Sequence, residues 1–208
     1  MTHPRALLAA ACALALSAPA FAGPAKGGVE CEGAKHEVKS TVAFWVPEKL
    51  QFQMLFLNEA MADADLQRIA FVEGASALGR PPKGAPAPTA EDMKLRQELS
   101  KKRAVLLRAN LKAAAEKLEN AEFAGAFLVS VNCGPNKSFN QSMRSGDKDA
   151  SADLKKQFPG MSVPLKAGAT VKVSSAKYDR KPDPAKKSGS QMSAKWQFGG
   201  ETKLVVIE

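Results

Sequence analysis

Apolar and polar side chains alternate between residues 37 and 46, directly before Pro47. A period of two places every second side chain on one face, so this segment predicts a half-buried strand that ends at the proline. The residues before it, 23–33, are rich in glycine, alanine and glutamate and show no period. We therefore expect residues 23–35 to form a flexible leader.

Two further segments between residues 48 and 78 are short and apolar. Residues 48–63 fit both a strand, with alternation over 50–56, and a helix, because Leu50, Met54, Leu57 and Met61 share one helical face. The helix is favoured, because the composition of residues 58–62 is typical of one. Leu66 to Glu73 is predicted as a short strand that stops at Gly74.

A long amphipathic helix is the clearest single element. A loop rich in proline and glycine (79–88) precedes Thr89, and Thr89 with Asp92 fits a capping box. The helical apolar positions continue to Leu118, so we expect one helix across this stretch. On that helix Arg103 would lie between Leu99 and Leu107, within the apolar arc.

The second half of the chain predicts mainly strands. Residues 123–133 form a nearly continuous apolar run, typical of a central strand. A polar, loop-rich stretch follows, with one short helix at 150–157. Strands are then predicted at 169–178, 192–198 and 203–208, the first two pairing across a basic loop with Val171 and Val173 facing Trp196 and Phe198. The fold class is therefore α+β or α/β, with a core over 36–134 and a basic, β-rich extension over 135–208.

The first 22 residues have the pattern of a cleaved signal peptide. A basic residue, Arg5, precedes an apolar run over 6–16, and Ala20-Phe21-Ala22 matches the small-residue cleavage pattern. We expect an exported protein, periplasmic or secreted, with lipid attachment at Cys12 as the alternative. No later run approaches the roughly 18 apolar residues that span a bilayer, so no transmembrane segment is expected after cleavage.

Positive charge is concentrated toward the C-terminus. The net charge is +9, and residues 123–208 hold 14 Lys and Arg against 7 Asp and Glu. Export argues against nucleic acid as a partner, so an acidic envelope polymer or anionic headgroups are the expected targets. The cations of the loop at 178–187 are the predicted contacts, and the alternative is that the charge serves only solubility. These cations are Arg180, Lys181, Lys186 and Lys187.

Cysteine and histidine limit the possible chemistry. Two cysteines remain after cleavage, Cys31 and Cys133, and an exported chain with one pair predicts one disulfide, the alternative being two free thiols. One histidine remains, His36, without the motif of a serine hydrolase or a metal site. Ser174-x-x-Lys177 imitates a penicillin-interacting motif, but it lies on a predicted strand, where residues three apart face opposite ways. We expect no catalytic residue, metal or cofactor.

One helix motif resembles a known family. Leu99-Ser100-Lys101-Lys102-Arg103-Ala104 resembles the Leu-Ser-x-x-Arg-Ala helix of OmpA-like peptidoglycan-associating domains, and a strand ending at Glu73-Gly74 precedes it. The resemblance implies a βαβαβ core with a mixed sheet and a ligand site at Arg103 beside the loop residues Gly74, Ser76 and Gly79. The aspartate of the family motif has no counterpart here.

The function expected from the resemblance is a non-enzymatic cell-envelope protein associated with peptidoglycan. Two other functions remain open at this point. The first is an exported hydrolase or enzyme inhibitor with an unrecognised site. The second is a structural or secretion accessory that acts through the basic C-terminal region.

Overall fold

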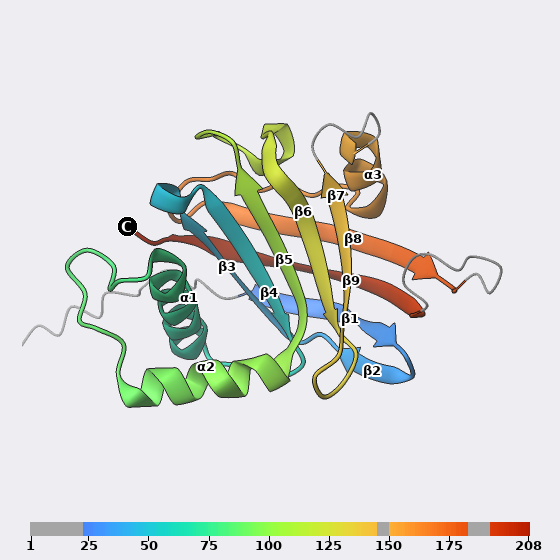
Figure 1. Ribbon diagram of the computed structural model, residues 1–208, viewed down its shortest axis with the longest axis horizontal. Helices are drawn as coiled ribbons and strands as arrows, with labels where there is room; N and C mark the ends of the chain where they lie inside the picture. The colour runs from blue at the N-terminus through green and yellow to red at the C-terminus, as the bar shows by residue number, and fades with distance from the viewer. Residues whose placement is uncertain (1–22, 145–149, 183–191) are drawn as a thin grey trace, which may run out of the picture.

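The computed structural model describes residues 23–144, 150–182 and 192–208 (Figure 1). The predicted signal peptide with Cys12, as well as Lys186 and Lys187, lies outside the described residues. The elements in chain order are β1 (Gly23–Cys31), β2 (Ala34–Glu37), β3 (Ser40–Val46), β4 (Gln51–Leu57), α1 (Asp63–Leu78), α2 (Ala90–Lys102), β5 (Arg103–Leu111), β6 (Phe123–Asn132), β7 (Ser138–Arg144), α3 (Ala150–Gln157), β8 (Thr170–Arg180) and β9 (Ala194–Val206).

All described strands belong to one curled, mixed sheet. Its order is β2-β1-β9-β3-β4-β5-β6-β7, with β8 on the other side of β9. The pair β3–β9 is parallel and the other pairs are antiparallel. The α+β class, the mixed sheet and the β-rich C-terminal part are therefore confirmed. Because β9 pairs with β1 as well as with β3, the last strand of the chain joins the first ones in the same sheet.

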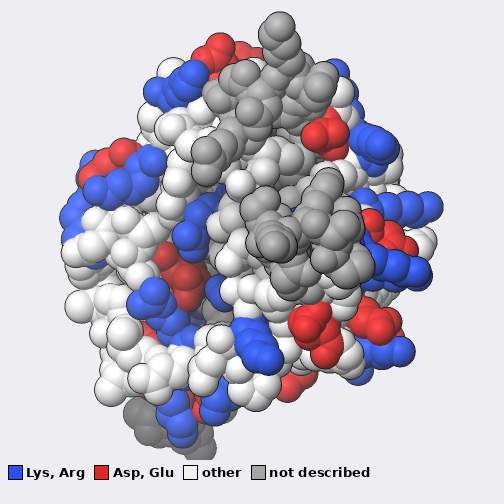
Figure 2. Space-filling view, turned by 45° about the vertical axis from the view of Figure 1, so that its right-hand side comes forward, with Lys and Arg blue, Asp and Glu red and all other residues white. Residues whose placement is uncertain are grey.

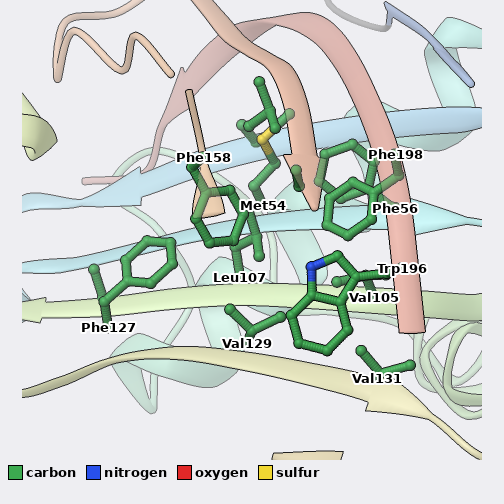
Figure 3. Packing of buried hydrophobic residues seen from close by; sticks show 14 of the residues in the cluster. Met54, Phe56, Val105, Leu107, Phe127, Val129, Val131, Phe158, Trp196 and Phe198 are labelled. Carbon is green, nitrogen blue, oxygen red and sulfur yellow. The ribbon is translucent and has the colours of Figure 1, made fainter. Parts of the chain in front are cut away.

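The curled sheet has a buried layer on each face. Its inner face holds the larger cluster, in which aromatic side chains of β4 and β9 meet, for example Phe56 and Phe198 with ring centroids 4.6 Å apart (Figure 3). On the outer face, α1 and α2 cover a second cluster with Phe44 of β3 and Leu106 of β5. Helix α3 packs beside β7 and β8. The outer side of β6 is only partly buried between Ala126 and Asn132, and that of β7 is exposed at Ser138, Asn140 and Ser142.

The helix α2 begins as predicted. Thr89 Oγ1 accepts a hydrogen bond from the backbone N–H of Asp92 (3.2 Å), and the Asp92 carboxylate accepts from the Thr89 N–H (2.7 Å). Arg68 of α1 donates to the same carboxylate at 2.5 Å. The Thr89 N–H first, and then Arg68 and the Thr89 hydroxyl, lower the pKa of Asp92 to about 2. The charged carboxylate thus joins the two helices.

The predicted extent of this helix is wrong. The helix ends at Lys102, and residues 103–111 are strand β5. Val105 and Leu107 face the inner cluster while Leu106 faces the outer one, so the strand is apolar on both sides. A strand buried on both faces gives a continuous apolar run that also fits a helical face. For the same reason, residues 51–57 form strand β4 and not the favoured helix.

Two other local predictions are wrong. Leu66 to Glu73 lies within helix α1, because Leu66, Ile69 and Ala70 are spaced to face β3 from one side of a helix. The expected leader is strand β1, which pairs with β2 and β9. Gly27 in this strand has φ +100°, and a Cβ there would lie 2.1 Å from the Gln197 carbonyl oxygen, so only glycine fits at this position. Glycine has no side chain, so it interrupts the apolar alternation by which a strand is recognised in the sequence.

The C-terminal strands and the short helix α3 are confirmed, with one change of register. Strands β8 and β9 pair as expected, but Val173 lies opposite Gly200 and Tyr178 opposite Trp196. The register shifts between Val173 and Ala176. The prediction that Val171 and Val173 lie opposite Trp196 and Phe198 is therefore wrong. The segments predicted at 192–198 and 203–208 form the single strand β9. Strand β7 was not predicted.

The predicted disulfide is confirmed. Cys31, at the end of β1, is bonded to Cys133, directly after β6, with an S–S distance of 2.04 Å. The bond links segments 102 residues apart in the sequence. Among the helices of the described residues, none is both long enough and apolar enough to cross a membrane.

Candidate functional site

A hollow of about 570 Å³ lies where the end of α2, the turn between β6 and β7, and β2 come together. In Figure 1 these elements meet at the lower edge of the molecule. We call this the Arg103 hollow. It is lined by His36, Ser100, Lys101, Arg103, Ser130, Asn132 and residues 134–138.

Arg103 is placed by the junction of α2 and β5. Its backbone N–H still donates to the Leu99 carbonyl, while its φ of −75° and ψ of 113° are those of a strand. Its own carbonyl accepts a hydrogen bond from the Asn132 side chain at 3.2 Å. Arg103 is therefore the last residue tied to the helix and the first residue of the strand, and its backbone is held from both sides.

The opposite wall is the tight turn after β6. The Cys133 N–H donates to the Lys137 carbonyl (3.0 Å), and Asn132 Oδ1 accepts from the Gly134 N–H (2.9 Å). Gly134 has φ +109° and Asn136 has φ +57°, left-handed conformations that glycine and asparagine tolerate best. The disulfide anchors the turn to β1. The wall is thus fixed by covalent and backbone interactions.

The lining of the hollow is cationic. Lys101, Arg103 and Lys137 line it, and no aspartate or glutamate does so among the described residues. Burial lowers the pKa of Arg103, the charge of Glu73 raises it, and the charge of Arg108 lowers it. A desolvated guanidinium with added donors from serine and asparagine side chains can bind a carboxylate or another anion.

Arg103 is not neutralised by the nearest acid. Glu73 of α1 pairs with Arg96 of α2 at 3.1 Å, and the structure contains no ion pair of Arg103 within its described residues. At the other side of the hollow, His36 Nε2 is buried and has no hydrogen-bond partner among the described residues. Among the described residues, the hollow therefore combines a cation without an ion pair and one imidazole nitrogen with unused hydrogen-bonding capacity.

The other residues of the predicted ligand site are not in this hollow. Gly74, Ser76 and Gly79 do not lie in a loop after a strand, because residues 63–78 form helix α1 and Gly79 ends it with φ +74°. Gly74 is buried, and Ser76 and Gly79 are exposed. None of the three lines the Arg103 hollow.

Gly74 has a packing role that a substitution can test. A Cβ on Gly74 would lie 2.7 Å from Ile207 Cγ1, so α1 approaches the end of the chain closely at this point. Gly74→Ala gains helix propensity of about 1 kcal/mol. We expect overpacking against Ile207 to cost about 1–3 kcal/mol, which leaves a net loss of stability of up to about 2 kcal/mol. Urea unfolding measures the difference, and Ser76→Ala on the exposed face is the control. A more stable Gly74→Ala variant would contradict this packing.

The predicted basic contacts have two described members, Arg180 and Lys181. The Arg180 guanidinium carbon lies 5.8 Å from the centroid of the Phe139 ring, at the end of β8. Cations of this part of the sheet are interleaved with acids, as in the pair Lys35–Glu30 (3.6 Å) and, at the other end of β8, the pair Lys172–Glu201 (3.9 Å). Figure 2 shows this alternation of charge down its right-hand side. The lysines of this surface are therefore partly neutralised.

Five polar residues of the hollow were not singled out from the sequence: Ser130, Asn132, Asn136, Lys137 and Ser138. The available signal was the absence of aspartate and glutamate from residues 123–144. Within the described residues, no three of histidine, cysteine, aspartate and glutamate gather in a metal-binding group. Comparisons of the chain with protein-family models, curated proteins and solved structures found no match.

Proposed function

We propose that this protein is a non-enzymatic, exported protein of the cell envelope that binds an anionic envelope polymer in the Arg103 hollow, with peptidoglycan as the first candidate. The observation that carries the proposal is Arg103 itself, a partly desolvated cation without an ion pair within the described residues, in a hollow lined by two lysines and no acid. A carboxylate of a peptide stem fits that environment, because a guanidinium binds carboxylates in bidentate geometry.

Two features support export. The pattern of residues 1–22 is that of a signal peptide, and the disulfide requires an oxidising compartment to form and persist. Peptidoglycan is an anionic polymer of the cell envelope, so a protein exported to the periplasm would encounter it. The resemblance of residues 99–104 to the peptidoglycan-associating helix motif points to the same ligand class, although Arg103 here begins a strand.

Cosedimentation with purified sacculi tests the proposal. The wild-type protein should sediment with them, and Arg103→Leu should weaken binding roughly 10- to 150-fold, since a charge-assisted hydrogen bond is worth about 1.5–3 kcal/mol. The variant should fold with near-normal stability, because no acid is left without a partner when Arg103 is replaced. A structural role for Arg103 would instead lower stability and preserve binding.

Arg80→Leu is the matched control. Arg80 is a half-exposed arginine whose ion pair with Glu48 lies outside the hollow, so the substitution removes the same charge elsewhere. Its binding should match that of the wild type. A wild-type protein that does not bind sacculi would remove peptidoglycan as the ligand, and equal binding by Arg103→Leu and Arg80→Leu would remove Arg103 as the contact.

A further inference from the structure

A bulge in β5 places a second arginine on the same face as Arg103. Arg103 and Arg108 are five residues apart, so a regular strand would point them to opposite faces. The register between β4 and β5 shifts at this point, because Phe56 pairs with Val105 while Leu57 pairs with Arg103. Ala104 is the extra residue, and its insertion restores Arg103 and Arg108 to one face.

The face in question is the outer one. Arg108 pairs with Gln53 of β4, whose neighbours Leu55 and Leu57 belong to the cluster beneath the helices, as does Leu106. Arg103 pairs with Leu57, which lies four residues after Gln53 on β4. At the usual rise per strand residue, the Cα atoms of the two arginines are therefore roughly 13 Å apart. The pKa of Arg103 responds to the charge of Arg108, so the two guanidinium groups interact electrostatically.

Arg108 also has unused hydrogen-bonding capacity. Its Nε is buried and has no hydrogen-bond partner among the residues that the structure describes. The described residues also provide no ion pair for Arg108. Like Arg103, it is a cation that is partly withdrawn from water and is not neutralised by a neighbouring side chain. Such a group is costly unless something else supplies the acceptor.

The strands around the two arginines carry no negative charge. Strands β5, β6 and β7 contain no aspartate or glutamate in their sequences. Beside the arginines, the outer face of β6 and β7 carries Ser130, Asn140 and Ser142, while Leu128 lies directly opposite Arg108. The exposed amide and hydroxyl groups of Asn140 and Ser142 add hydrogen-bonding partners for an anion on this face.

We propose that Arg103 and Arg108 form one extended site on the outer face of β5–β7 that binds two anionic groups of the same ligand, an oligoanion bearing carboxylates or phosphates. The inference rests on the proposed function in taking Arg103 as an anion contact, and it adds that the ligand extends from the hollow past Ser130 on β6, because Leu106 between the arginines is buried beneath the helices. A ligand with one charge would occupy only one arginine, so a chain of repeated anionic units is the chemistry that fits.

Calorimetric titration with short soluble oligoanions tests this site. The probes are an oligogalacturonate, which carries carboxylates, and a polyphosphate of similar length. Arg108→Gln should weaken binding of the accepted probe roughly 10- to 150-fold. Arg108→Lys should recover part of the affinity, because it restores the charge without the planar fork. Arg80→Gln, on a different surface, is the control and should bind like the wild type.

The probe whose affinity falls identifies the anionic group. If Arg108→Gln binds both probes as Arg80→Gln does, or if the wild type binds neither probe, the two-arginine site is wrong. The near-ultraviolet circular dichroism of each variant must match the wild type, and Arg108→Lys supplies the comparison if Arg108→Gln does not fold. If sacculus binding depends on Arg103 but oligoanion binding does not depend on Arg108, the proposed function stands and the two-arginine site is wrong. If oligoanions bind through both arginines but sacculi do not bind, the two-arginine site stands and peptidoglycan is wrong as the ligand.

Discussion

Replacing Cys31 and Cys133 together by serine is expected to lower the free energy of unfolding by about 4–5 kcal/mol. The disulfide closes a loop between residues 102 positions apart, so it restricts the unfolded chain strongly. Urea unfolding of the oxidised wild type and of the double variant measures the loss. Each cysteine is buried, and the substitution adds a hydroxyl in place of each sulfur, which increases the loss.

A reductant provides the control for this prediction. Dithiothreitol should lower the stability of the wild type toward that of the double variant and leave the double variant unchanged. The wild type with and without reductant should therefore differ by a similar free energy. Equal unfolding midpoints for the oxidised wild type and the double variant would contradict the stabilising role of the bond.

Phe56→Ala should cost about 3–5 kcal/mol, the range for removing a buried phenylalanine side chain from a core. Phe56 is fully buried, and its ring lies 4.6 Å from that of Phe198, so the pair joins β4 to β9 across the curled sheet (Figure 3). Loss of this contact removes packing between strands far apart in the sequence. Thermal or urea unfolding of the variant gives the value.

Phe123→Ala is the comparison for Phe56→Ala. Phe123 begins β6 and is only partly buried, with its ring 6.0 Å from that of Phe127. Its replacement should cost less than half as much as that of Phe56, because part of its surface already contacts water. Similar losses for the two variants would show that the closure of the sheet between β4 and β9 does not dominate the stability.

The sequence predicted the class of fold but not the elements at its centre. Thr89 and Asp92 begin α2 as expected, because a capping box depends on residues three apart. The strands β4 and β5 were missed or merged with a helix, because both of their faces are buried. A period of two appears when one face of a strand contacts water. It is lost in β4 and β5, because helices cover one face of the sheet and the curl of the sheet brings its own distant strands against the other face.

The candidate site was predicted only in part. Arg103 was singled out from a helical motif, whereas its environment depends on a helix that ends one residue earlier and on a turn held by the Cys31–Cys133 bond. Arg108 was missed, since a bulge at Ala104 is what brings it to the face of Arg103. Such a shift depends on the pairing of β5 with β4, which local sequence does not encode.

Nuclear magnetic resonance mapping of the bound ligand tests the central claim most directly. Soluble peptidoglycan fragments are titrated into the isotopically labelled wild type, and backbone amide shifts are followed. Saturable shifts are expected within residues 100–103 and 130–138, the two segments that carry most of the lining of the Arg103 hollow, and these shifts should be lost in Arg103→Leu. Shifts confined to the lysine-bearing strands β8 and β9, or no shifts at saturating fragment, would contradict it.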